Sequence, residues 1–214
     1  KGFYKKNWWN KINSILWTTL DSLPILPDAI EFAKKTKHFY VWASFAEKAL
    51  KESGVDNAKT LHGSIDLDNF FKFSFEERSQ LREIFNINQN SFVIGFVFRN
   101  QLRKSVPNLL EGFSLFKRKN PSVDAKLLLH AHWSEGWDIP RLIKEKDINP
   151  EDVLCTYFCK KCKKYEIKPY SGPKQDCRFC GTKGSQNTVT IADGVSEEQL
   201  NEIYNLMDVY PSLL

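Results

Sequence analysis

The sequence has no apolar run approaching the ~20 residues that a membrane-spanning helix needs, and no apolar core of a secretory signal. It also has no internal repeat and no low-complexity tract. Hydrophobic residues make up 42% of the chain and aromatic residues 14%, which favours a globular protein over a disordered one. With 214 residues, the chain can bury a sizeable core as one large domain or one and a half.

Common catalytic signatures are missing too. The sequence has no convincing Ser/His/Asp order, no P-loop and no paired-carboxylate spacing. Any catalytic or binding site therefore has to be sought from the order of strands and helices.

Cysteine is scarce, but four of the five cysteines form two knuckles, Cys159-x₂-Cys162 and Cys177-x₂-Cys180, separated by fourteen residues. A tight turn at each pair can orient two thiolates toward one ion, and Gly181 supplies the freedom that such a turn needs. A redox pair would open a helix after a strand, and neither pair has that context. The spacing predicts one structural Zn²⁺ in a closed shell, which leaves no open position for chemistry.

The remaining cysteine, Cys155, lies in an apolar run, where we expect a small buried residue. One unpaired thiol and four suited to a metal favour a reducing, cytoplasmic setting. The segment from Lys1 to Lys11 mixes lysines with aromatic residues, a composition that also suits a membrane surface. We favour the edge of a domain whose beginning precedes Lys1, and we expect both ends of the chain to be cuts in a longer protein.

Positive charge is concentrated around the cysteines. From Cys159 to Asn187, eight Lys and Arg residues face only Glu166 and Asp176, which gives a net charge of +6; because the whole chain carries +5, the rest sums to −1. One interpretation is a solvated loop kept soluble by lysines. The other is a basic patch for an anionic partner, such as a sugar nucleotide, a lipid phosphate or a nucleic acid.

Strand and helix patterns alternate along the chain. The run Phe92–Phe98 is continuously apolar, as expected for a strand buried on both faces. Ser74-x-x-Glu77 is a capping box, and Ser196 with Gln199 opens another helix. The alternation predicts an α/β fold, a Rossmann-type parallel sheet with helices on both faces, and the cysteine module is an insertion at 155–187. The predicted strands are 38–42, 92–98, 126–130, 153–158 and 188–191, and the predicted helices are 28–35, 44–54, 74–85, 106–120, 138–146 and 196–207.

The loop after Phe98 carries Arg99, Asn100, Arg103 and Lys104. In an open parallel sheet, ligands bind at the carboxyl ends of the strands, and the helix that starts near Val106 points its N-terminus at the same place. Fixed cations and a helix N-terminus together suit a phosphate group. The alternative is an ordinary surface loop with solvated cations.

Other candidates are less specific. His130 and His132 end the next strand and could reach the same edge as Arg99, or they could simply be a polar strand end. Trp133 and Trp137 could stack on a base or a sugar, although packing is the more common role. A loop histidine at position 62 could line a cleft between domains, but it is more often a surface residue.

Four segments of the sequence resemble a known family. The segment FVIGFVFRNQLRKSVPNLLEGF (92–113) is similar to the start of the second domain of retaining glycosyltransferases with the GT-B fold (group 1, family 4-like), where a strand ends in Arg and a Lys follows five positions later. Arg99 and Lys104 have this separation. Three further segments agree with it in order and spacing: YVWASFAEKALKESG (40–54), LHGSIDLDNF (61–70) and GVSEEQLNEIYNLMDVYPSLL (194–214).

The resemblance implies an incomplete glycosyltransferase that moves a sugar from a nucleotide-sugar donor to an acceptor hydroxyl, with hexose as the implied sugar class. Residues 1–66 would be the end of the acceptor domain and 67–214 an incomplete donor domain. Arg99 and Lys104 would hold the donor diphosphate and stabilise the leaving group. The family's acidic E-x₇-E motif would follow Leu214, its Gly-rich first strand would precede Lys1, and most relatives have no zinc ribbon at this position.

Two alternatives remain open on sequence alone. A basic zinc ribbon on an α/β scaffold could be a non-catalytic module that binds nucleic acid or another anionic partner. The chain could also be a degenerate relative with a structural role. Neither the sugar, the nucleotide nor the acceptor (glycan, lipid or protein) can be read from the residues.

Overall fold

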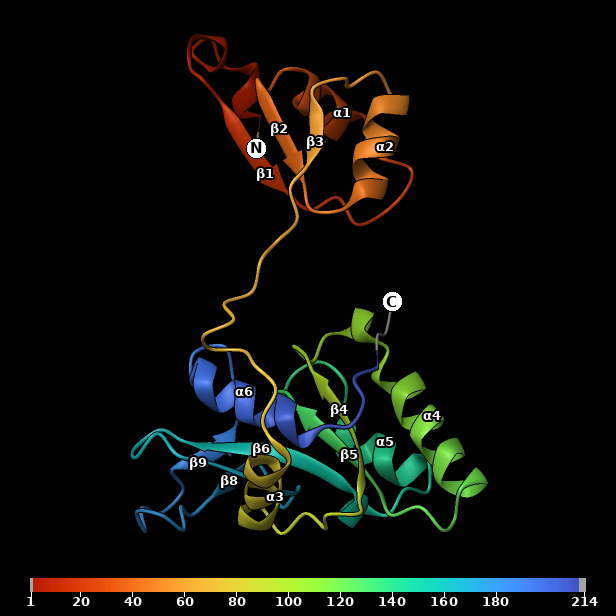
Figure 1. Cartoon of the computed structure of the whole chain (residues 1–214), viewed down its shortest axis with the longest axis vertical. Helices are drawn as coiled ribbons and strands as arrows, with labels where there is room; N and C mark the ends of the chain where they lie inside the picture. The colour runs from red at the N-terminus through yellow and green to blue at the C-terminus, as the bar shows by residue number, and fades with distance from the viewer. Residues whose placement is uncertain (1, 212–214) are drawn as a thin grey trace. The chain divides into compact units, whose positions relative to one another are not determined.

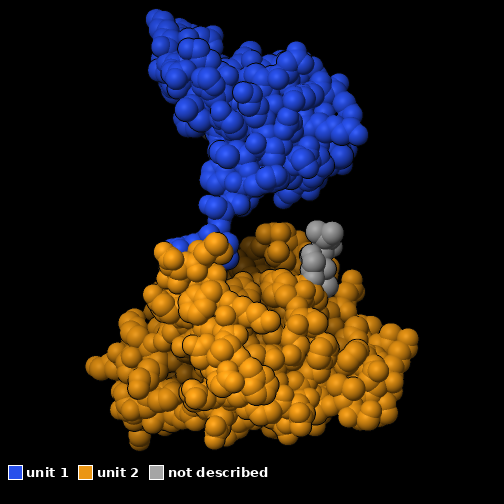
Figure 2. Space-filling model, in the orientation of Figure 1, with its two compact units in different colours: residues 1–66 blue, residues 67–214 orange. Residues whose placement is uncertain are grey.

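The computed structural model describes residues 2–211. The chain divides into two compact units, Lys1–Asp66 and Leu67–Leu214 (Figure 2). The division falls between Asp66 and Leu67. The identities of the units as acceptor and donor domains remain predictions.

Unit 1 is a small parallel sheet covered on one face. Phe39 and Val41 of the middle strand pack with Ala46 and Leu50 of the second helix in a common apolar core. The second helix begins at Ser44, with Ala43 as its N-cap. The sheet order is β1-β2-β3, and both pairings are parallel (Figure 1). The elements are η1 (Phe3–Lys5), η2 (Trp9–Lys11), β1 (Ile15–Thr18), α1 (Pro27–Lys34), β2 (His38–Val41), α2 (Ser44–Glu52) and β3 (Ala58–Thr60).

Unit 2 is an α/β domain, as predicted. Its sheet has helices on both faces, and side chains alternate between two apolar clusters: Leu127 and Leu129 face α4 and α5, whereas Leu128 faces α3 and α6. The elements are α3 (Phe75–Ile84), β4 (Phe92–Val97), η3 (Leu102–Lys104), α4 (Val106–Lys119), β5 (Ala125–His130), α5 (Ile139–Glu145), η4 (Pro150–Asp152), β6 (Val153–Cys159), β7 (Tyr165–Pro169), β8 (Lys174–Gln175), β9 (Gln186–Thr188) and α6 (Glu197–Leu206).

Both predicted helix starts are confirmed as capping boxes. The hydroxyl of Ser74 accepts from the backbone N–H of Glu77, and the Glu77 carboxylate accepts from the backbone N–H of Ser74. Ser196 and Gln199 exchange the same pair of hydrogen bonds at the start of α6. Each box satisfies two backbone donors that a helix N-terminus would otherwise leave without a partner.

The predicted parallel sheet is formed by β4, β5 and β6, and the cysteine segment adds antiparallel strands to it. β7 pairs antiparallel with Leu154–Phe158 of β6, and β9 pairs antiparallel with Tyr157–Cys159. The strand predicted at 188–191 lies instead at Gln186–Thr188. The reason is that the cysteine segment folds back along β6 as hairpins, whereas a helical crossover would have returned it parallel.

The cysteine segment is therefore not an insertion between strands that would close without it. Tyr165 and Ile167 of β7 are buried in the same cluster as Leu128, Ile203 and Leu206. Removing residues 160–187 would remove β7, β8 and most of β9 and expose this face of the sheet.

Candidate functional site

A pocket of ≈ 310 Å³ lies at the carboxyl ends of β4 and β5. Arg99, directly after Phe98, forms one side, and His130, His132 and Glu135 line the part beyond β5. The segment 189–195, which follows β9, supplies residues of the opposite wall. This is the edge at which open parallel sheets bind ligands, and the sequence placed Arg99, His130 and His132 there.

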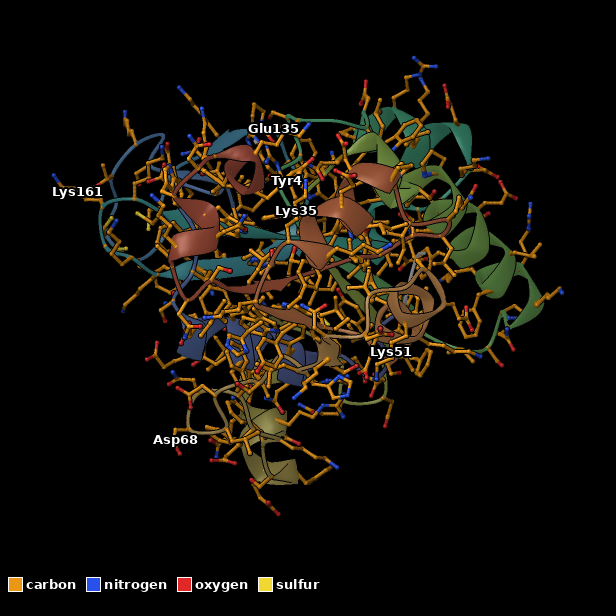
Figure 3. The ribbon with its side chains drawn as sticks, turned by 90° about the horizontal axis from the view of Figure 1, so that it is seen from above. Tyr4, Lys35, Lys51, Asp68, Glu135 and Lys161 are labelled. Carbon is orange, nitrogen blue, oxygen red and sulfur yellow. The ribbon has the colours of Figure 1, made fainter. Side chains whose placement is uncertain are left out.

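The polar groups of the pocket are arranged around Glu135, which comes from the loop after β5 and is labelled in Figure 3. Its Oε2 lies 3.8 Å from Nε of Arg99, and its Oε1 lies 3.3 Å from Nδ1 of His132. That nitrogen of His132 is buried but not aligned for a hydrogen bond. Arg99 and Glu135 are about half exposed, so both can exchange their partner for a ligand or for water.

His130 is held neutral. Its Nδ1 lies 3.0 Å from Oγ1 of Thr156 on the neighbouring strand. Burial lowers the pKa of its imidazole to about 4. At neutral pH, His130 thus offers the pocket a hydrogen-bonding group without charge.

Asn100 does not face the pocket, although the sequence analysis predicted it as a ligand-binding residue. Its side chain is 2% exposed. The amide nitrogen donates to the backbone oxygen of Trp137 at 2.9 Å and to that of Glu135, and Oδ1 accepts from the Trp137 N–H at 3.1 Å. Gly136 lies between Glu135 and Trp137 with φ +62°, and an added Cβ there would lie 2.2 Å from the backbone carbonyl oxygen of Asn100. Asn100 thus fixes the loop that carries Glu135.

Arg103 and Lys104 lie on η3, outside the lining of the pocket. Nε of Arg103 donates to Oε1 of Gln101 at 3.2 Å. Helix α4 then starts after Ser105, which has φ 44° and no side-chain cap. Of the four predicted donor-binding residues, the structure brings Arg99 alone into this pocket.

Trp133 and Trp137 both have packing roles, the more common of the two roles considered from the sequence. Trp133 is 4% exposed and stacks on Tyr170, with ring centroids 4.6 Å apart. Nε1 of Trp137 donates to the backbone oxygen of Leu102 and so fixes η3. No motif in the sequence marks Glu135, and the first part of the wall at 189–195 was hidden by the strand predicted at 188–191.

A second site is the cluster of four cysteines. The Sγ atoms of Cys159, Cys162, Cys177 and Cys180 all lie within 4.8 Å of one another. Two of the distances are 3.8 Å (Cys159 to Cys180) and 3.6 Å (Cys162 to Cys177). A tetrahedron of sulfurs around zinc at about 2.3 Å has edges of about 3.8 Å, so the four thiols fit this metal.

The two knuckles have the same backbone geometry. In the first knuckle, the Cys159 N–H donates to the Lys164 carbonyl, and the Cys159 carbonyl accepts from the Lys163 N–H. In the second, the Cys177 N–H donates to the Thr182 carbonyl, and the Cys177 carbonyl accepts from the Gly181 N–H. Lys163 and Gly181 occupy matching positions with φ 60° and 67°. Gly181 therefore has the left-handed conformation that its place in the sequence predicted.

The thiols differ in their ease of ionisation. Burial opposes ionisation of Cys159, but hydrogen bonds from the Cys162 and Lys161 backbone and from Ser185 outweigh it and lower its pKa to about 6. Burial and neighbouring thiols raise the pKa of Cys162 to about 12. Cys155, in contrast, is fully buried away from this cluster, and burial raises the pKa of its thiol, as expected for a packing residue.

No family model matches the chain, and no curated protein matches it. Among solved structures, it is similar to a glycosyltransferase from Rickettsia africae ESF-5 (TM-score 0.48, 16% identity, covering 64% of this chain and 38% of that one). It is also similar to Anabaena Alr3699/HepE, solved in complex with UDP and glucose (TM-score 0.49, 18% identity, 65% and 40% covered). The chain spans less than half the length of either protein. Within the described residues, no helix is both long enough and apolar enough to cross a membrane.

Proposed function

We propose that this chain is part of a GT-B-type glycosyltransferase, in which Arg99 and Lys104 bind the diphosphate of a nucleotide-sugar donor. The observation that carries the proposal is the position of Arg99 at the carboxyl end of a central parallel strand, beside a pocket of ≈ 310 Å³. The Arg-x₄-Lys spacing before a helix, on which the family resemblance rests, supplies the second cation.

The proposed chemistry depends on charge. When the glycosidic bond of the donor breaks, negative charge grows on the departing diphosphate, and a fixed guanidinium stabilises it. Arg99 would then exchange Glu135 for phosphate oxygens. Lys104, on η3, would approach from the start of α4. The acidic residues that contact the sugar in the family would come from beyond Leu214.

The remaining assignments follow the same proposal. Unit 1 would be the end of the acceptor domain and unit 2 most of the donor domain, with a hexose as the sugar. The four cysteines would hold one structural Zn²⁺, which contributes folding energy and no catalytic step. Reduced thiols favour the cytoplasm, where nucleotide sugars are available as substrates.

The direct test is calorimetric titration of the 214-residue chain with UDP, GDP, ADP and CDP, each beside its free nucleoside. We expect one diphosphate to bind at least tenfold more tightly than its nucleoside, since one charge-assisted hydrogen bond contributes about 1.5–3 kcal/mol. If each of the four diphosphates binds no more tightly than its own nucleoside, the proposal is contradicted.

A second candidate function is binding of single-stranded nucleic acid by the cysteine segment. Five of its lysines make no ion pair in the described part of the chain: Lys161, Lys163, Lys164, Lys174 and Lys183. Affinity for an oligonucleotide should then fall steeply between 50 and 200 mM salt. The glycosyltransferase proposal predicts no oligonucleotide binding at physiological salt.

A further inference from the structure

The cysteine cluster and the candidate pocket are joined by a short piece of chain. Lys160 directly follows the ligand Cys159, and its Nζ lies 2.6 Å from Oδ2 of Asp193. Asp193 belongs to the segment 189–195, whose Ile191 and Gly194 line the pocket. One side chain thus connects the first knuckle to the pocket wall.

A second connection runs through Ser185. Its hydroxyl lies 3.2 Å from Sγ of Cys159, and its carbonyl accepts from the Lys160 N–H at 3.1 Å. Ser185 immediately precedes β9, and β9 leads directly into Val189, the first residue of the wall. The metal ligands therefore fix the start of this wall as well as its middle.

Both ends of the wall are held by the apolar core, since Val189 is buried in it and Val195 packs against it, but the turn between them has little else to hold it. The turn from Thr190 to Asp193 is closed by two of its own hydrogen bonds, the Thr190 N–H to the Asp193 carbonyl and the Asp193 N–H to the Thr190 hydroxyl. Ile191 is 77% exposed, so no core packing anchors the middle of the turn. The ion pair with Lys160 is the one contact in the described residues that ties the Asp193 side chain to another element.

We propose that the metal-bound knuckle holds the wall of the candidate pocket in place through Lys160, which makes Lys160 a positioning residue for the bound nucleotide. The nature of the ligand and the presence of metal at the four cysteines rest on the proposed function. Binding of the metal would fix Cys159, and with it the backbone from which Lys160 reaches Asp193. Loss of the metal would free the knuckle and let the turn at 190–193 move.

Hydrogen exchange tests the coupling without any ligand. The amides of Thr190 and Asp193 should exchange about three- to fivefold faster in Lys160→Ala, the range for loss of a partly exposed ion pair. They should exchange faster still after chelation of the metal. Lys161→Ala is the matched control, because Lys161 is the next residue, exposed and without an ion pair in the described chain (Figure 3). Amides in α4 serve as the internal reference.

A charge exchange separates positioning from general destabilisation. Lys160→Asp should accelerate hydrogen exchange at 190–193, and the double variant Lys160→Asp, Asp193→Lys should return the exchange rate to that of wild type. The melting temperature should stay unchanged. If exchange at Thr190 and Asp193 is the same in wild type, Lys160→Ala and Lys160→Asp, the coupling does not exist.

Titration with the same four nucleoside diphosphates completes the test. If wild type binds one of them, Lys160→Ala should bind it severalfold more weakly and Lys161→Ala as wild type does. Unchanged affinity in Lys160→Ala would overturn the positioning role and leave the proposed function intact. If wild type binds none of them, the proposed function fails, and the exchange data alone decide whether the metal site holds the wall.

Discussion

Nε of Arg99 lies 3.8 Å from Oε2 of Glu135, so the guanidinium of the candidate pocket faces a carboxylate from the loop after β5. The distance is too long for a hydrogen bond, and both side chains are about half exposed. Glu135 therefore keeps Arg99 near the pocket without neutralising it completely. An incoming diphosphate would compete with Glu135 for the guanidinium.

Glu135→Gln should strengthen binding of a nucleoside diphosphate about two- to fivefold, because the competing and repelling charge is removed at a partly solvated site. The gain should shrink at high ionic strength, where such charges are screened. Titrations at 50 and 500 mM salt measure both effects. Glu145→Gln, which changes a carboxylate paired with Arg141 on α5, is the control and should leave affinity unchanged.

Metal analysis of the chain purified without added zinc should give about one equivalent, and chelation should lower the melting temperature of unit 2. The reason is that β7 and β9, which the knuckles hold, pair with β6 and cover one face of the core. Unfolding of unit 1, followed separately by hydrogen exchange in β2, should not respond. A chain that binds no metal and melts identically with and without chelator would contradict the assignment of the cysteines.

His130 should make the fold less stable in acid. Its pKa is lowered by burial from its ordinary value of 6.5 to about 4, so the unfolded chain binds the proton more readily than the folded one. Stability is then complete above pH 6.5 and falls as the pH drops toward 4, by at most about 3 kcal/mol and less because the ring borders the open pocket. His130→Gln should weaken the dependence of the urea unfolding midpoint on pH between pH 4 and 6.5. A dependence as steep as in wild type would show that other groups cause the loss of stability.

Arg82→Ala should destabilise unit 2 by about 3–5 kcal/mol. The guanidinium is 2% exposed and donates to backbone oxygens of Gln89, Ser91 and Leu206 and to Oδ2 of Asp208. Its removal takes this donor from the buried backbone oxygens of Ser91 and Leu206 and takes its buried cation from Asp208, which still accepts from the Val93 N–H. Arg78→Ala is the control, since Arg78 also pairs with Asp208 but is 30% exposed, and it should cost under about 1 kcal/mol in urea denaturation.

The sequence predicted those elements whose pattern is local. The apolar run at Phe92 and the boxes at Ser74 and Ser196 form where expected, since pattern and cap lie within a few residues. The two cysteine knuckles were equally readable from their spacing. In each case, the pattern that predicts the element lies within a few neighbouring residues, even where, as in β4, the pairing that completes it is distant.

Features set by distant contacts could not be predicted. Tyr165–Pro169 alternates apolar and polar residues over only four positions of a lysine-rich stretch, and it becomes β7 because β6 offers it a free edge. The apolar Val189 and Ile191 suggested a strand at 188–191, but pairing of Gln186 with Cys159 shifts the strand toward the metal site. Asn100 looked like a ligand from its place after β4, and only the returning loop at Trp137 shows where its amide points.

The central claim is that Arg99 binds the diphosphate of a nucleotide, and titration of Arg99→Ala tests it most directly. Arg99→Ala should lose about 1–3 kcal/mol of affinity for the nucleoside diphosphate that wild type prefers, the range for charge-assisted hydrogen bonds. Lys104→Ala is measured beside it, and Lys119→Ala is the remote control. Affinity for the free nucleoside should not change, and Lys119→Ala should behave as wild type. Diphosphate affinity that is the same in Arg99→Ala, Lys104→Ala and wild type would contradict the account.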